Sequence, residues 1–412
     1  MRFPSQPAAS QAATGAVERG LGRAAAWALA LTLLAPALRA QKASPGRPET
    51  AAQYLAGANA AMAKNDAPRA IAIFQRGLTA HPGWREGWWD LGSLFYEAHQ
   101  YDPASSAFAH LTQLDPKAGA AWVMLGLCDF EMRNYGLSLE HLVKGRALGF
   151  PKNPELSDAA RYHQALLLIA AGHFEPAHLL LGGFAAENHP SDSVKVAFGL
   201  DALQMPLLPD QAEEILSDDQ LALVRSLGEA EWQASARSND AADTDFQAVV
   251  AKYPSARWVH YAYGIWLASM GRLDRAAAMF NREIALNPTS VMARLQLAGM
   301  AMTQGHPADG IPMAREAVAM APKLGAAHYL LGQCLTLSGE LAEGTKELEK
   351  ARDLSPESSE IRYALAQAYI KDHRRADARR EQQAFLKLKP IEDSMLYKGV
   401  LPSTLFLPAK KK

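Results

Sequence analysis

The stretch that decides the fold is residues 88–95, Trp-Trp-Asp-Leu-Gly-Ser-Leu-Phe, which is followed by Ala104, Phe108 and Pro116. Part of it returns 34 residues later, where the chain again carries a tryptophan and a Leu-Gly pair. A fixed period of this length indicates stacked helical hairpins. The same interval separates five prolines in the second half of the chain: Pro254, Pro288, Pro322, Pro356 and Pro390.

Each recurring residue type has a packing role in such a hairpin. Glycine in the first helix, as at Gly92, lets that helix approach its neighbour closely, and alanine in the second helix, as at Ala104, does the same from the other side. Phenylalanine fills the space between them. The closing proline ends the second helix, because it lacks an N–H and disfavours helical geometry in the residue before it. The repeat-signature positions are Trp88, Leu91, Gly92, Ala104, Phe108, Pro116, Trp122, Gly126, Gly264, Ala276, Phe280, Pro288, Pro322, Gly332, Pro356 and Pro390.

This pattern resembles the tetratricopeptide repeat (TPR) family, in which an aromatic residue and Leu-Gly are followed by Tyr or Phe, and then by Ala, Phe, Ala and Pro. The resemblance covers most of residues 51–390. It implies an all-α fold, a right-handed superhelical solenoid of stacked antiparallel helix hairpins. We expect nine repeat units, whose first helices begin near Ala51, Arg85, Gly119, Asp158, Leu223, Arg257, Val291, Gly325 and Ser359.

The units fall into two arrays. We expect an N-terminal array of about four units over residues 51–190 and a C-terminal array of about five units over residues 223–390. Residues 391–412 then form a cap over the last hairpin and a basic tail, since the exposed end of a repeat stack needs cover.

Residues 191–222 break the period, and Pro206 and Pro209 forbid a regular helix across the middle of this segment. It is either a flexible linker or a degenerate hairpin whose second helix is replaced. We favour a packed, irregular helical joint, because five residues could bury one helical face: Val194, Ala197, Phe198, Leu200 and Leu203.

The N-terminus has the parts of a secretory signal peptide. Arg19 and Arg23 precede an apolar run over residues 24–38, and small residues follow it. We therefore expect residues 1–40 to be a signal peptide, and the protein to be exported to the periplasm or secreted. An uncleaved N-terminal membrane anchor is the alternative, although Pro36 interrupts a run that is short for a bilayer span. After cleavage we expect no membrane span.

The composition excludes several classes of protein. The chain has 412 residues, of which 49% are hydrophobic, so it is not disordered. Its net charge of -1 gives no reason to expect nucleic acid as a partner. Only 8% of the residues are aromatic, and an apolar fraction carried by Ala and Leu favours helix.

No motif for catalysis, metal binding or a cofactor stands out. The chain has no His-Glu-x-x-His, no Gly-x-Ser-x-Gly and no phosphate-binding glycine loop. Cys128 and Cys334 occupy equivalent places in two distant repeats, which predicts small semi-buried residues rather than a disulfide. We expect no enzyme activity and no cofactor or metal.

The remaining candidate for a functional site is a binding surface. In the family, the second, fifth, ninth and twelfth positions of each first helix line a concave groove, and those positions here include Ile265 and Ile370. The carboxylate clamp of some family members is absent, since only Asn59 matches its pattern. The candidate groove residues for peptide binding are Asn59, Trp89, Tyr96, Phe130, Trp258, Tyr261, Tyr329 and Tyr363.

The sequence therefore predicts a non-catalytic scaffold in the cell envelope that binds partner proteins or peptides through this groove. The alternative is a carbohydrate-binding or enzyme-accessory module that uses the groove aromatics. The sequence does not define the oligomeric state.

Overall fold

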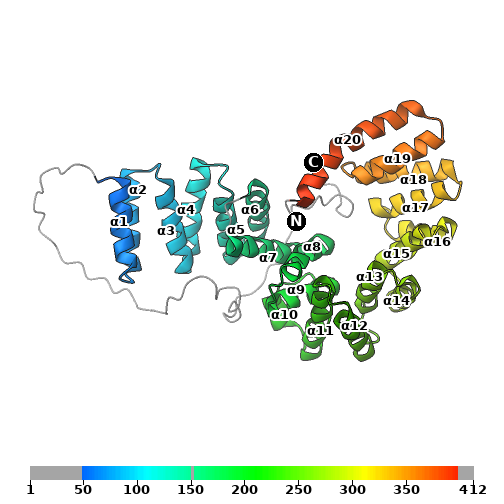
Figure 1. The fold of residues 1–412 in the computed structure, drawn as a ribbon, viewed down its shortest axis with the longest axis horizontal. Coiled ribbons are helices and arrows are strands. Elements are labelled where there is room, and N and C mark those ends of the chain that lie inside the picture. Colours follow the sequence, from blue (N-terminus) through cyan, green and yellow to red (C-terminus); the bar gives the residue numbers. More distant parts are fainter. Residues whose placement is uncertain (1–48, 150–152, 398–412) are drawn as a thin grey trace, which may run out of the picture. The chain divides into compact units, whose positions relative to one another are not determined.

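The computed structural model describes residues 49–149 and 153–397. Over these residues the chain forms twenty α-helices and no strand, which confirms the all-α prediction (Figure 1). It divides into two compact units, unit 1 up to His163 and unit 2 from Gln164 onward. The segment 191–222 therefore lies inside unit 2, and the division falls within a helix.

Unit 1 contains three hairpins and the start of the helix in which the division falls. The helices are α1 (Ala51–Met62), α2 (Ala67–Ala80), α3 (Arg85–Glu97), α4 (Tyr101–Leu114), α5 (Gly119–Glu131), α6 (Tyr135–Leu148) and α7 (Pro154–Ala170). Within each hairpin an odd-numbered first helix packs on an even-numbered second helix, and α2 and α4 also pack on the first helices that follow them, α3 and α5 (Figure 1).

Unit 2 continues the alternation to the end of the described chain. Its helices are α8 (Phe174–Ala186), α9 (Asp192–Ala202), α10 (Pro209–Ile215), α11 (Asp218–Ser235), α12 (Asn239–Lys252), α13 (Val259–Ser269), α14 (Leu273–Leu286), α15 (Val291–Thr303), α16 (Pro307–Met320), α17 (Gly325–Leu337), α18 (Leu341–Leu354), α19 (Ser359–Lys371) and α20 (Arg375–Tyr397).

The close approach within a hairpin is visible at the signature glycines. A Cβ added at Gly92 would lie 2.9 Å from the ring of Phe108, and one added at Gly264 would lie 2.7 Å from the ring of Phe280. Both phenylalanines are fully buried. A larger residue at either glycine would therefore push the first helix off the second.

Left-handed residues at the end of the first helix turn the chain into the second. At Gly271, for example, the N–H bonds the carbonyl of Ala268, and the N–H of Arg272 bonds that of Leu267. Several of these residues are not glycine, which is why the sequence pattern shows only some of the turns. The left-handed residues that recur at this place are Asn65, His99, Arg133, Gly172, Gln204, Arg237, Gly271, Gly305, Gly339 and His373.

Within the segment 191–222, α9 and α10 form a short hairpin, and residues 218–222 already belong to α11. Helix α9 ends at a left-handed residue like the other first helices, and α10, with seven residues, takes the place of the second helix. The five apolar residues assigned to one face of this segment, Val194, Ala197, Phe198, Leu200 and Leu203, are buried.

Because α10 is so short, α9 packs directly on α11. The two backbones meet at a pair of glycines. A Cβ added at Gly199 would lie 2.0 Å from the carbonyl oxygen of Val224, and one added at Gly228 would lie 1.9 Å from that of Lys195. Neither position tolerates a side chain without movement of a helix.

Pro390 does not end a helix, contrary to our expectation. It lies inside α20, which continues to Tyr397. A proline within a helix leaves the carbonyl four residues earlier without its usual N–H partner. Here that residue is Leu386, whose side chain is 67% exposed, so water can reach this part of the helix and satisfy the carbonyl.

The expected signal peptide and basic tail lie outside the described residues, except that residues 391–397 continue α20. Among the helices that the structure describes, none has both the length and the apolar character needed to span a membrane.

Candidate interaction surface

In unit 1, the two adjacent tryptophans of α3 have different surroundings. The Trp88 indole N–H donates to the Pro82 carbonyl at 2.8 Å, and its ring lies 4.4 Å from that of His110. The Trp89 ring meets Phe108 edge-on at 5.6 Å. Both tryptophans are half-buried against the same core, so Trp89 is only partly available to a partner.

The role of Trp88 recurs along the chain and was missed in the sequence. The residue six positions after a closing proline returns a hydrogen bond to that proline's carbonyl. Trp122 bonds Pro116 at 3.0 Å, and Arg362 bonds Pro356 at 2.8 Å. His328 makes the equivalent contact to Pro322 at 3.0 Å. The recurring feature is a side-chain N–H, which three different residue types supply, and a search for aromatic residues does not detect it.

The other candidates of unit 1 lie in the second half of first helices. Tyr96 is half-buried and meets Tyr101 at 5.5 Å between ring centroids. Phe130 is half-buried and meets His163 edge-on at 4.6 Å. Asn59 is exposed on α1. The structure thus leaves part of each side chain open on the first helices.

In unit 2, Trp258 is not on a first helix, contrary to our expectation. Its backbone is left-handed, with φ 71°, and α13 begins at the next residue. The cause is Glu283 of α14, a fully buried carboxylate that accepts the Trp258 backbone N–H at 2.8 Å. This contact holds the chain out of the helix at a position where the repeat pattern predicts helix.

The three tyrosines of unit 2 that we placed in the groove differ in exposure. Tyr261 is half-buried against Phe280, at 5.8 Å between ring centroids, and burial raises its pKa to about 12. The hydroxyl of Tyr329 donates to Glu360 at 2.9 Å. Tyr363 is 51% exposed, and Ile370, seven residues further along α19, is 46% exposed. Residues seven apart share one helix face, so α19 presents these two apolar side chains on one face, with the exposed Gln367 between them.

An ionisable cluster, which sequence reasoning missed, joins three helices of unit 2. We call it the acidic cluster: Glu175 and His178 of α8, Asp201 of α9 and Glu231 of α11. The His178 Nδ1 lies 3.0 Å from an Asp201 carboxylate oxygen. Burial raises the pKa of Glu231 to about 7, opposed by the charge of His178 and reinforced by that of Asp201. Residues so far apart in sequence give no local signal.

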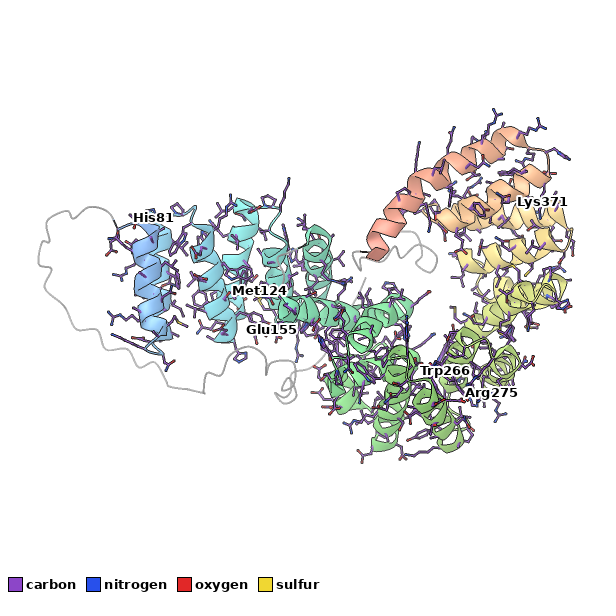
Figure 2. All side chains as sticks on the ribbon, in the orientation of Figure 1. His81, Met124, Glu155, Trp266, Arg275 and Lys371 are labelled. Atoms are coloured by element: carbon purple, nitrogen blue, oxygen red, sulfur yellow. The ribbon has the colours of Figure 1, made fainter. Side chains whose placement is uncertain are left out.

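A shallow cleft of about 360 Å³ lies between α12, α13 and α14, on the side of the second helices. Arg275, labelled in Figure 2 near Trp266, lies at its edge. Asp243 accepts hydrogen bonds from Tyr263 at 2.5 Å and Arg272 at 2.6 Å, and it also pairs with Arg275 at 3.1 Å. These groups hold the pKa of Asp243 well below its usual range, although its partial burial acts the other way. The network ties the three helices together.

Neither cysteine is poised for chemistry. Cys128 and Cys334 are both free and buried. Burial raises the pKa of the Cys128 thiol to about 12 and that of the Cys334 thiol to about 11. A thiol with so high a pKa is protonated at neutral pH and is a poor nucleophile.

These consecutive hairpins, with their 34-residue spacing and glycine contacts, define a helical repeat protein. The tetratricopeptide repeat model matches residues 225–291 and 295–359. Residues 225–359 therefore carry tetratricopeptide repeats, and the helices of unit 1 recur at the same 34-residue spacing.

Several solved structures resemble the chain over less than half of its length. MamA from Desulfovibrio magneticus RS-1 is 21% identical, covers 43% of this chain and 99% of its own, and has a TM-score of 0.39. A second MamA structure is 18% identical, covers 40% of this chain and 96% of its own, and has a TM-score of 0.37. YrrB, described as a TPR protein with an unusual peptide-binding site, is 17% identical. It covers 46% of this chain and 95% of its own, and has a TM-score of 0.36. A search of curated proteins found no significant match.

Proposed function

We propose that this protein is a non-catalytic scaffold that binds peptide segments of partner proteins through side chains on its first helices. Tetratricopeptide repeats form an interaction surface by stacking, because each hairpin buries its apolar face only against its neighbours and leaves a long face free. The proposal concerns each compact unit separately. Binding would hold a partner in place, with no bond made or broken.

The observation that carries the proposal is the pair of exposed apolar side chains on one face of α19. Tyr363 and Ile370 lie at predicted groove positions and are about half exposed. Ile265 on α13, at another groove position, is 36% exposed. A partner gains more by desolvating such side chains than by touching small residues, and aromatic residues dominate measured interfaces.

The sequence supports an envelope location for this activity. The apolar run over residues 24–38, with Arg19 and Arg23 before it, has the composition of an export signal. N-terminal sequencing of protein recovered from fractionated cells tests this part. A new N-terminus near residue 41 in the envelope fraction is expected, and an intact Met1 in the cytosolic fraction would contradict it.

The binding proposal is tested on a peptide array and a glycan array, with full-length protein and the Tyr363→Ala and Tyr261→Ala variants. We expect selected peptides to bind, and each variant to weaken binding by about tenfold. The matched control is Leu137→Ala, which removes an exposed apolar side chain from the second helix α6. Retention of glycans alone, lost in the tyrosine variants, would establish the carbohydrate-binding alternative instead.

A further inference from the structure

The outer face of α20 carries basic side chains along its length. Helix α20 is the second helix of the last described hairpin, and its inner side packs on α19 through residues such as Ala378. From residue 375 to residue 390, every side chain on the opposite side is exposed. We call this surface the basic face, because five of its residues are basic and none is acidic. Its members are Arg375, Ala376, Arg379, Arg380, Gln382, Gln383, Leu386, Lys387, Lys389 and Pro390.

The acidic residues in this part of α20 lie away from the basic face and are paired. Asp377 is partly buried and pairs with Arg374 at 2.7 Å, and it also pairs with Arg380. Glu381 is 6% exposed and pairs with Arg362 of α19 at 2.8 Å. Both carboxylates are therefore already engaged within the hairpin.

Three charges of the basic face are uncompensated. Arg375, Arg379 and Lys387 have no ion-pair partner among the residues that the structure describes. Lys371, labelled in Figure 2, adds to the charge at the turn before α20. The segment 371–390 carries seven Lys and Arg against three Asp and Glu, although the net charge of the whole chain is -1. The sequence after it, residues 391–412, has four lysines and two acidic residues. Positive charge is thus concentrated locally in a chain that is nearly neutral.

An exposed apolar side chain lies among these charges. Leu386 is 67% exposed, more than any other large hydrophobic side chain that the structure describes. It lies seven residues after Arg379, so the two share one stripe of the face, and Lys387 and Lys389 lie on either side of it. At a lipid surface, an apolar side chain can enter between the headgroups while neighbouring basic side chains keep their charged ends on the phosphates. The basic face offers both kinds of side chain in that arrangement.

The spread of the charges favours a lipid surface over a discrete ligand. At 1.5 Å per residue, Arg375 and Lys389 lie about 21 Å apart along the helix. A peptide carboxylate or a single phosphate is held by groups that converge, whereas an anionic bilayer presents charge at any spacing along an exposed helix. The face has no aromatic residue on which a nucleic-acid base could stack.

We propose that the basic face of α20 binds the surface of a membrane that contains anionic lipid, with Leu386 entering the headgroup region. This inference goes beyond the proposed function, because it adds a second binding surface on a second helix. The first helices of unit 2 need take no part in it. A partner peptide and a membrane could therefore be held at the same time.

The test is a footprint of full-length protein on lipid vesicles, made with an amine-reactive label and read by mass spectrometry. The apolar run of residues 24–38 could itself enter a bilayer, so the measurement is made at α20 and not from total binding. Lys387 reports on the basic face, and the exposed Lys346 of α18 is the reference within the same molecule. With vesicles that contain about 30 mol% phosphatidylglycerol, we expect Lys387 to react about tenfold more slowly and Lys346 to keep its rate. Vesicles of phosphatidylcholine alone should protect neither lysine.

Variants assign the protection to the basic face. We expect Arg375→Gln and, separately, Arg379→Gln to raise the lipid concentration for half-maximal protection about fivefold each. Leu386→Ala should raise it by a similar factor, because an apolar contact with the bilayer is lost. The matched controls are Arg282→Gln on α14 and Leu179→Ala on α8, both at exposed residues of unit 2, and neither should change it. Raising the salt from about 0.1 M to about 1 M should abolish the protection, since the screening length falls from about 10 Å to about 3 Å.

Each other outcome overturns the proposal. Lys387 that reacts equally with and without anionic vesicles, or that neutral vesicles protect equally well, would show that the face does not bind anionic lipid. Protection by a glutamate-rich decapeptide but not by vesicles, with no effect of Leu386→Ala, would assign the face to an acidic protein segment. Protection by a DNA duplex alone would assign it to nucleic acid. Circular dichroism confirms that each variant is folded, and the peptide-array result has no bearing on this footprint.

Discussion

Replacing Gly228 by alanine tests the direct contact between α9 and α11. The added Cβ would lie 1.9 Å from the Lys195 carbonyl oxygen and 2.8 Å from its carbon. Both are backbone atoms, so no side chain can rotate away. The helices must separate by about 1 Å or more, and the buried side chains of Phe198 and Leu227 then lose contacts.

The magnitude follows from two opposing effects. Overpacking typically costs about 1–3 kcal/mol, and a clash with backbone atoms belongs at the upper end of that range, whereas alanine gains about 1 kcal/mol over glycine in a helix. We therefore expect Gly228→Ala to lower the free energy of unfolding of the α9–α11 region by about 2 kcal/mol. Gly182→Ala is the control, because a Cβ at Gly182 in α8 meets nothing within 4 Å. It should be neutral or stabilise by up to about 1 kcal/mol.

Hydrogen exchange read by mass spectrometry is the appropriate assay, because a repeat array need not unfold in one step. Amides of α9 and α11 should exchange about thirtyfold faster in Gly228→Ala, while those of α17 and α18 keep their rates. Equal protection in Gly228→Ala and Gly182→Ala would refute the backbone contact.

Two substitutions and one labelling experiment probe the ionisable groups. Glu231→Gln should raise stability at pH 8 by at most about 3 kcal/mol and leave it unchanged below pH 4.5. The reason is that a carboxyl whose pKa rises on folding stabilises the protein only while protonated, and urea titrations at both pH values measure the effect. Asp243→Asn should lower the free energy of unfolding by about 1 kcal/mol at pH 7, and by progressively less as the pH falls below 3.8. The reason is that a carboxyl whose pKa is lowered on folding stabilises the protein only while ionised. The effect is small because the arginine partners of Asp243 are well exposed. Cys128 and Cys334 should resist a disulfide reagent in the folded protein and react in denaturant; rapid labelling of either thiol under native conditions would contradict their burial.

The positions at which the hairpins begin could be predicted from the sequence because similar contacts between helices recur at a fixed interval. The expected starts at Ala51, Arg85, Gly119, Val291, Gly325 and Ser359 coincide with the observed first residues of helices. The starts expected at Asp158, Leu223 and Arg257 differ by a few residues from the observed Pro154, Asp218 and Val259. In the hairpins that begin at Arg85, Gly119 and Gly325, a glycine of the first helix lies against a large apolar residue of the second, in the pairs Gly92–Phe108, Gly126–Leu142 and Gly332–Leu348. The local pattern therefore carries tertiary information.

Departures from the pattern depend on contacts between distant residues. Trp258 leaves the helix because of Glu283, which is 25 residues away. The hairpin over residues 191–222 could have been recognised from its length, close to one repeat, but its two glycine contacts are visible only once α9 and α11 are placed. The candidate site residues also fall into two groups, those that the repeat pattern predicts and those that depend on contacts between distant residues. The repeat period placed Tyr363 on an open face, whereas Glu231 interacts with His178 and Asp201, which lie on two other helices.

The glycine contact between α9 and α11 also has a mechanical consequence for unit 2. A stack of hairpins can bend elastically where neighbouring helices slide over rearranging side chains. At Gly199 and Gly228 backbone meets backbone, so no rotamer change can accommodate a displacement. When unit 2 is strained by a load, this junction should act as a rigid element, and the deformation should fall on the side-chain interfaces to either side.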